Sequence, residues 1–302
     1  MNPHCTQFPD GRWHFQHGPM DIIIDAHGDA DAVQAAHADA WRRFAGILGE
    51  LVEELPFLRQ PVGGQCLLRG AIARRMWKAC QPYRRGFITP MAAVAGAVAQ
   101  ELIACYTRSG VSRAWVNNGG DIALHLTPGE SLRIGLFADL ARLDMDEVTG
   151  GVHIDGRFEV SSALPVRGVA TSGWRGRSFS LGVADSVTVL ARTAAQADAA
   201  ATVIANAVDV VDARIRRSRA CDLKDDTDLG EMRVTVDVPP LEPDVVRRAL
   251  CAGLERAKAL RAEGLIWSAA LVCQKQWMTT SDTTAQRLQS CSGETQCGSV
   301  FA

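Results

Sequence analysis

The sequence lacks the short motifs of several common enzyme classes. It contains no GxxxxGK[ST] phosphate loop, no HExxH zinc motif and no GxSxG nucleophile turn. Most of its histidines crowd the N-terminal segment without the spacing of zinc ligands: His4, His14, His17, His27 and His37. The sequence therefore argues against a P-loop enzyme, a zinc enzyme and a serine hydrolase.

The sequence also has little excess of either charge and no long apolar run. Lys+Arg 32 against Asp+Glu 34 gives a net charge of -2, so there is no general basic field to hold a nucleic acid. The apolar segment 91–106 is too short to span a membrane and includes Gln100 and Glu101. The nine cysteines form no CxxC pair, and no signal-peptide pattern is present. We expect a cytoplasmic protein that binds a small molecule, with no nucleic-acid or membrane partner.

Helical and strand periods alternate along the chain, which predicts an α+β fold. Helices are predicted over 29–54, 91–108, 193–218 and 243–262, and strands over 21–26, 113–118, 121–126, 131–137, 152–160, 166–191, 232–238 and 265–273. The basic stretch 67–80 fits either a helix or a strand passing into one, and basic 214–219 is predicted to be the solvated end of a helix. We expect an N-terminal extension (1–20), one main domain (21–275) and a disordered tail (276–302).

The sequence NNGGD lies between two predicted strands. Asn118, Gly119 and Gly120 are typical of a tight hairpin turn, because glycine and asparagine tolerate positive φ. Glycine also lets a ligand approach the backbone closely, and Asp121 would place a carboxylate beside it. A structural turn and a ligand-binding turn are both consistent with this pattern.

A second segment, 168–186, is rich in glycine, hydroxyl groups and arginine. Its candidate ligand contacts are Thr171, Ser172, Gly173, Arg175, Arg177, Ser178 and Ser180. Hydroxyls, free N–H groups and guanidinium groups suit phosphate oxygens, although such hydroxyls are often satisfied by the backbone instead.

A narrow polar stripe runs along the otherwise apolar helix that begins near residue 193. Asp198, Thr202, Asn206 and Asp209 follow one another at intervals of four, four and three, which puts them on one face. They could serve local roles, with Asp198 favouring the helix dipole, Thr202 bonding back to a carbonyl and Asn206 capping a neighbour. Alternatively they form an oxygen-ligand site for Mg²⁺, which usually takes one or two protein carboxylates plus waters and phosphates.

Four segments taken together resemble the ApbE-like superfamily, whose best-known members are FAD:protein FMN transferases. They are ITPMAAVAGAVAQ (88–100), VNNGGDIAL (116–124), VATSG (169–173) and SVTVLARTAAQADAAATVIANAV (186–208), and their order and spacing match over about 20–275. The chain is most similar to a branch of uncharacterised proteins in that superfamily. The resemblance implies a T-fold-related α+β architecture of antiparallel sheets packed with helices, in two lobes with a ligand cleft between them.

The resemblance also implies site residues and cofactors. In the flavin transferases a D-x-x-x-T helix supplies metal ligands, which correspond here to Asp198 and Thr202. Their glycine turn lies near the nucleotide and corresponds to Gly119, Gly120 and Asp121. Mg²⁺ and FAD or FMN are therefore the implied cofactors.

Two departures from the transferase pattern limit what the resemblance implies. The His-x-x-Asp-Pro-x-Thr-Gly segment that closes over the flavin in the transferases is absent here, which argues against FMN transfer. Arg177 stands where the most similar branch tends to have a histidine, so positive charge remains but a group that titrates near neutral pH is lost.

The leading hypothesis is an ApbE-like enzyme that binds a flavin, a nucleotide or another anionic heterocyclic molecule. Asp185 and Asp121 are the candidate catalytic carboxylates, and Asp198 with Thr202 is the candidate metal site. The candidate cofactor-binding residues are Asn118, Gly119, Gly120, Thr171, Ser172, Gly173, Arg177, Ser178 and Asn206.

Two alternatives stay open. One is a flavin-independent or reductive enzyme of N-heterocycle metabolism, associated with 6-hydroxynicotinate reductase-like proteins, and the other is a non-catalytic flavin-binding accessory protein. The apolar, small-residue segment 91–106 and the predicted sheet also leave surface for pairing, so we expect a homodimer.

Overall fold

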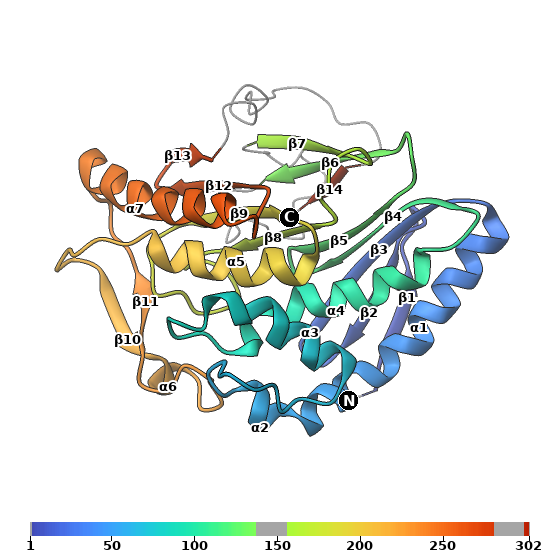
Figure 1. Ribbon diagram of the computed structural model, residues 1–302, viewed down its shortest axis with the longest axis horizontal. Helices are drawn as coiled ribbons and strands as arrows, with labels where there is room; N and C mark the ends of the chain where they lie inside the picture. The colour runs from blue at the N-terminus through green and yellow to red at the C-terminus, as the bar shows by residue number, and fades with distance from the viewer. Residues whose placement is uncertain (1, 137–155, 281–298, 302) are drawn as a thin grey trace. The chain divides into compact units, whose positions relative to one another are not determined.

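The computed structural model describes residues 2–136, 156–280 and 299–301, which divide into two compact units. The first unit comprises Met1–Leu132, Val160–Ala170 and Ala191–Ala199, and the second comprises Arg133–Glu159, Thr171–Leu190 and Ala200–Ala302. Both units combine helices with antiparallel strands (Figure 1), so the predicted α+β class is confirmed.

The first unit is built on an antiparallel sheet. Its strands, in spatial order, are β1 (His4–Gln7), β2 (Trp13–His17), β3 (Met20–Gly28), β4 (Val111–Asn118), β5 (Asp121–Leu126) and β8 (Gly168–Ser172). The predicted strand 21–26 lies in β3. Residues 4–17, which belong to the predicted N-terminal extension, supply the strands β1 and β2 that continue this sheet beyond β3.

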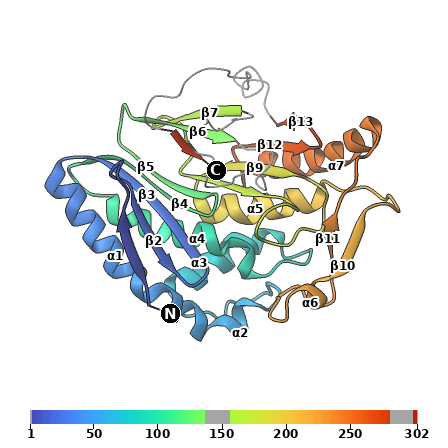
Figure 2. The ribbon, with the colours of Figure 1, turned by 180° about the vertical axis from the view of Figure 1, so that it is seen from behind.

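Helices cover one face of this sheet, as the views from both sides show (Figures 1 and 2). The helices α1 (Ala30–Glu53) and α4 (Val94–Ile103) contact the strands, whereas α3 (Ala71–Cys80) packs against α4 and α2 (Leu55–Leu58) against α1. Short 3-10 turns lie at Gln81–Tyr83, Pro90–Ala93 and Ala104–Tyr106.

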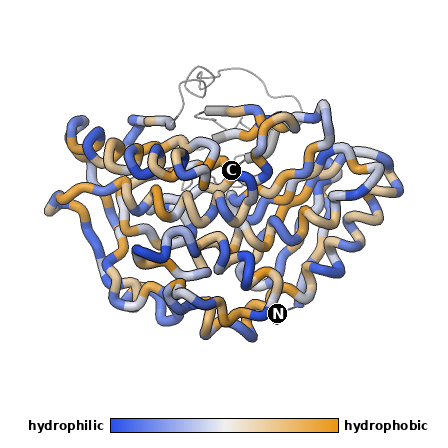
Figure 3. Tube along the Cα trace, viewed as in Figure 1, coloured by the Kyte–Doolittle hydropathy of each residue, from blue (hydrophilic) through white to orange (hydrophobic). Residues whose placement is uncertain are grey.

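Helix α1 follows directly from its sequence pattern. The Asp29 side chain accepts the backbone N–H groups of Asp31 and Ala32, which caps the start of the helix. The buried residues Ala36, Ala40, Phe44, Ile47 and Leu51 recur every three or four positions, so one side of the helix faces the sheet. Figure 3 shows hydrophilic and hydrophobic residues alternating along this helix.

The second unit contains three small groups of strands. The strands β9 (Ser186–Ala191), β12 (Ser268–Cys273) and β13 (Gln276–Thr279) form one antiparallel group, in which β12 pairs with both β9 and β13. Helix α7 (Pro243–Ala262) packs along β12 and β13. Two further sheets pair β10 (Arg216–Arg219) with β11 (Arg233–Asp237), and β14 (Ser299–Phe301) with β6 (Ser131–Leu136) and β7 (Gly156–Ser161).

One helix is shorter than predicted. Helix α5 spans Ala194–Ala207 rather than continuing to 218, and the basic stretch forms β10, so its interpretation as the end of a helix was wrong. The β-branched Val210 and Val211 follow the helix, and the Asp212 side chain accepts the backbone N–H of Arg214, which favours a turn. The short helix α6 (Ala220–Leu223) comes directly after β10.

The predicted disordered tail, 276–302, includes β13 and β14, whereas residues 281–298 and 302 lie outside the described residues. Every cysteine in the described ranges is a free thiol. In those ranges no helix combines the length and the apolar character needed to cross a membrane.

Candidate functional site

The hairpin between β4 and β5 has the turn that the sequence predicts. Gly119 and Gly120 have φ values of 65° and 106°, and the Asn117 side chain accepts the Gly120 N–H at 2.8 Å. Asn118 and Asp121 face each other across the turn and are both buried. The hairpin thus fixes an amide and a carboxylate at one end of the sheet of the first unit.

Two of the predicted site residues meet at one peptide group of α4. The Asn118 side-chain amide donates to the Ala95 carbonyl at 3.1 Å, and the Gly96 N–H donates to the Asp198 carboxylate at 2.9 Å. The Ala95–Gly96 peptide is therefore held by the hairpin through its carbonyl and by the first turns of α5 through its N–H.

Gly96 is required at this place because α4 and α5 approach closely. A Cβ atom on Gly96 would lie 2.4 Å from the carbonyl oxygen of Ala194 and 2.9 Å from the Asp198 Cβ. Such distances are well inside van der Waals contact, so a larger residue would push the helices apart.

Asp198 acts as an N-terminal cap for another helix. The residue at the start of α4, Ala93, has no side-chain acceptor, and the Asp198 carboxylate takes the N–H groups of Ala95 and Gly96 instead. Burial raises the pKa of Asp198 from its ordinary value of 3.8 to about 7, although these two N–H groups act to lower it. The carboxyl group therefore titrates in the neutral range.

The residues at this place fit a Mg²⁺ ion only in part. Thr202 lies four residues after Asp198 and on the same face of α5, and both side chains are partly exposed. Nowhere in the described parts of the chain do three or more His, Cys, Asp or Glu side chains gather as a metal site. A cation here would take one protein carboxylate and one hydroxyl, and its other ligands would be water and ligand phosphate oxygens.

Asp185 is the corresponding buried carboxylate of the second unit. It accepts the backbone N–H of Gln274 at 2.5 Å and the indole N–H of Trp174 at 3.2 Å, and it lies 3.2 Å from the Arg175 guanidinium. The same guanidinium lies over the Trp174 ring, 5.0 Å from its centre. Asp185 thus ties the loop after β8 to the turn between β12 and β13.

That turn has a backbone conformation that the sequence analysis missed. Gln274 and Lys275 have φ values of 45° and 69°, which are unusual for residues other than glycine. The Gln274 side chain donates to the Pro239 carbonyl at 2.7 Å and accepts the Leu241 N–H at 2.9 Å. No glycine or asparagine in the sequence signals this turn.

The remaining predicted residues of the second unit are divided between structural contacts and exposed positions. Thr171 and Thr188 share a hydrogen bond of 2.9 Å, and a Cβ on Gly173 would lie 2.3 Å from the Asp185 carbonyl oxygen. The side-chain amide oxygen of Asn206 accepts the Leu181 N–H at 2.9 Å and the Ser180 hydroxyl at 3.2 Å. Ser172 is half-buried, Arg177 and Ser178 are exposed, and Asp209 pairs with Arg217.

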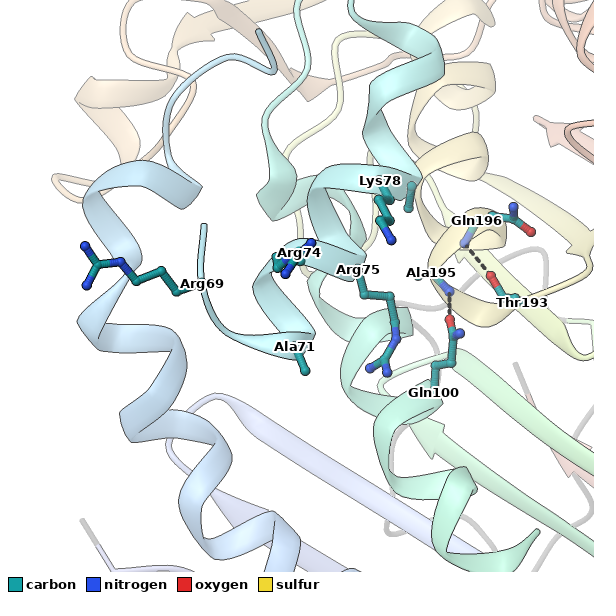
Figure 4. A pocket seen from close by; sticks show the side chains of 10 residues that line it. Arg69, Ala71, Arg74, Arg75, Lys78, Gln100, Thr193, Ala195 and Gln196 are labelled. Carbon is teal, nitrogen blue, oxygen red and sulfur yellow. Dashed lines mark hydrogen bonds between the residues drawn. The ribbon is translucent and has the colours of Figure 1, made fainter. Parts of the chain in front are cut away.

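A further feature that the sequence analysis missed is a pocket of about 490 Å³ in the first unit (Figure 4). Its lining residues are Arg69, Ala71, Arg74, Arg75, Lys78, Ala79, Gln100, Thr193, Ala195 and Gln196. None of the predicted site residues is among them. The basic stretch 67–80 was the available signal, because its cations recur at helical spacing.

Comparison with known proteins gives a family and several similar chains. Residues 5–280 match the family described as AbpE bacteria. A UPF0280 protein of Methanopyrus kandleri is 38% identical over 173 residues, which are 56% of this chain and 64% of that protein. Another, from Methanospirillum hungatei, is 36% identical over 128 residues, which are 41% of this chain and 47% of that protein. The chain spans between about half and two thirds of the length of these curated relatives.

The chain is also similar to a solved structure. The flavinyl transferase ApbE of Pseudomonas stutzeri, in its apo form, shares 14% sequence identity at a TM-score of 0.47, with 95% of this chain and 98% of that chain covered. The family match spans most of the chain and confirms the resemblance drawn from the four sequence segments. The chain belongs to the family described as AbpE bacteria.

Proposed function

We propose that this protein binds a flavin nucleotide, FAD or FMN, or a closely similar anionic heterocyclic molecule, together with Mg²⁺. The observation that carries the proposal is the meeting of Asn118 and Asp198 at the Ala95–Gly96 peptide. Three sequence segments that carry the family resemblance converge there within the first unit. A ligand-binding site is expected to bring such segments together. The local structure of each segment alone does not require them to meet.

The proposed roles follow the chemistry of each group. Asp198 and Thr202, one turn apart on α5, hold Mg²⁺ against a ligand phosphate, and Asp121 orients the ligand or transfers a proton. Within the first unit, the proposed ligand contacts are Asn118, Gly119 and Gly120. Within the second unit, the proposed contacts to an anionic group are Thr171, Ser172, Gly173, Arg177, Ser178 and Asn206. FMN transfer is not proposed, because the segment that closes over the flavin in the transferases is absent.

A non-catalytic flavin-binding protein is the second candidate. It is favoured by the contacts of Asp185, whose carboxylate is engaged by Arg175, Trp174 and the Gln274 N–H. A carboxylate held by a guanidinium and two N–H groups is a poor base, because all three partners stabilise its charged form.

Native mass spectrometry and an absorbance spectrum, with FAD added before and after Mg²⁺, test the binding. We expect the mass of one flavin nucleotide on the wild-type chain, with occupancy that increases when Mg²⁺ is added. The variant Asp198→Asn should lose the response to Mg²⁺, whereas Asp244→Asn on the exposed surface of α7 should keep it. A wild-type chain that binds no flavin in the presence of millimolar Mg²⁺ would contradict the proposal.

A further inference from the structure

The pocket of the first unit has an almost purely cationic wall. Helix α3 turns its apolar side chains, among them Ile72 and Met76, into the core and presents Arg74, Arg75 and Lys78 on the opposite side. Arg69 precedes the helix and extends away from α5 (Figure 4). No aspartate or glutamate is among the residues that line the pocket.

Three of the four pocket cations make no ion pair within the described residues. Arg75 is held by the Glu101 carboxylate at 2.8 Å and by the Ala97 carbonyl at 3.1 Å. By contrast, Arg69, Arg74 and Lys78 form no ion pair with any carboxylate in the described parts of the chain. Exposed cations on one concave wall repel one another, and a bound anion relieves that repulsion.

The opposite wall supplies hydrogen-bond donors. Gln100 of α4 accepts the Ala195 N–H at 3.4 Å, and the Thr193 hydroxyl accepts the Gln196 N–H at 3.3 Å (Figure 4). Both distances are longer than the usual 2.9 Å or so of N–H···O bonds. The first-turn N–H groups of α5 are therefore weakly satisfied and lie on the same pocket as the cations.

We infer that this pocket is a binding site for a small molecule that carries a phosphate or diphosphate group. A multivalent phosphate matches several cations and N–H donors at once, and arginine offers it paired donors. A volume of about 490 Å³ suits a ligand of nucleotide size rather than a macromolecular surface. Arg74 and Lys78, one turn apart on α3, bind the phosphate oxygens, and Arg75 is positioned beside them by Glu101. The site uses none of the residues assigned to the flavin proposal.

Calorimetric titration of the full chain with inorganic pyrophosphate, in a buffer free of phosphate, tests this inference. The double variant Arg74→Glu/Lys78→Glu reverses two charges of the pocket. The control Arg248→Glu/Lys258→Glu makes the same change in net charge at exposed positions of α7. We expect saturable binding by the wild type and the control, and binding weakened by roughly a hundredfold or more in the pocket variant, since each charge-assisted contact contributes about tenfold.

Three results would overturn the inference: no pyrophosphate binding by the wild type at millimolar concentration, equal binding by the pocket variant, or equal loss in the control. If circular dichroism shows that the charge-reversed variant is unfolded, Arg74→Gln/Lys78→Gln replaces it with the same expectation. The variant Asp198→Asn should bind pyrophosphate as the wild type does. That result separates this site from the flavin proposal, which can fail without affecting it.

Discussion

Two hydrogen-bonded carboxylates, partly exposed Asp198 of the first unit and buried Asp185 of the second, show what a cationic partner changes. Asp185 lies beside the Arg175 guanidinium and accepts two N–H groups, so its charged form is matched on several sides. Within the described residues, Asp198 accepts the helix N–H groups of Ala95 and Gly96 and forms no ion pair, and burial raises its pKa to about 7.

The difference distinguishes a carboxylate with a structural role from a carboxylate that can take up a proton or bind a metal ion. A carboxylate paired with arginine holds two segments together and has little to gain from a proton or a metal ion. By contrast, a carboxylate that is stabilised by N–H dipoles alone becomes more stable when it binds a proton or a metal ion. Of the two, Asp198 is therefore the better candidate for a functional role, and variants of both residues can test that ranking.

The largest effect is expected from Asp185→Ala. The substitution leaves Arg175, which is one third exposed, and the Gln274 N–H without their carboxylate, and losing hydrogen bonds to a charged acceptor costs about 1.5 to 3 kcal/mol. Urea denaturation at neutral pH measures the change in the free energy of unfolding. As a control, Asp185→Asn keeps an acceptor for the N–H and should lose less. A loss below about 1 kcal/mol in both variants would show that Asp185 is not a framework contact.

A smaller loss is expected from Asp198→Ala at pH 5. At this pH the carboxyl group is protonated and still accepts the α4 N–H groups, so alanine removes the cap of that helix. Loss of an N-terminal cap costs about 1 to 2 kcal/mol. Asp198→Asn retains an acceptor oxygen and should recover much of the stability. Equal losses in the two variants would mean that the hydrogen bond to Gly96 contributes nothing.

The pH dependence of Asp198 is expected to be a third, still smaller effect. Because its pKa is about 7 in the folded chain and 3.8 ordinarily, the folded state holds a proton between pH 4 and 7 that the unfolded state has lost. Stability contributed by this proton is fully present below pH 4 and is lost as the pH rises to 7. Relative to Asp198→Asn, the wild type should lose about 1 kcal/mol across this window in chelator, after allowance for solvent screening.

Denaturation curves at several pH values check this expectation. The difference between wild type and Asp198→Asn is the quantity to follow, since other titrating groups cancel in it. A difference that stays constant from pH 4 to 8, or that grows in favour of the wild type, would show that the pKa of Asp198 is not raised.

Local sequence patterns predicted the elements that local interactions determine. Helix α1 has its cap at Asp29 and a regular apolar face, and the β4–β5 hairpin has its glycines at the turn. The end of α5 was missed because Arg216–Arg219 pairs with Arg233–Asp237, a partner that helical spacing cannot reveal.

The candidate site was predictable in its residues but not in their contacts. The even spacing of Asp198, Thr202 and Asn206 signalled a shared face. The hydrogen bond between Asp198 and Gly96, which lies 102 positions earlier, depends on how α4 and α5 pack. The pocket needs α3, α4 and the start of α5 together, and only the charge of 67–80 hinted at it.

The smallest change in stability is expected from Thr202→Val. This variant gives the sharpest test of whether Asp198 and Thr202 share a Mg²⁺ ion. Valine keeps the shape of threonine and removes its hydroxyl, and Thr202 is only partly buried, so the free energy of unfolding in chelator should change by less than about 1 kcal/mol. If Asp198 and Thr202 share a cation, Mg²⁺ stabilises the wild type above pH 7 and stabilises Thr202→Val less. Thermal denaturation with and without Mg²⁺ measures this. Equal stabilisation of both chains would place any Mg²⁺ elsewhere and leave Asp198 as a helix cap.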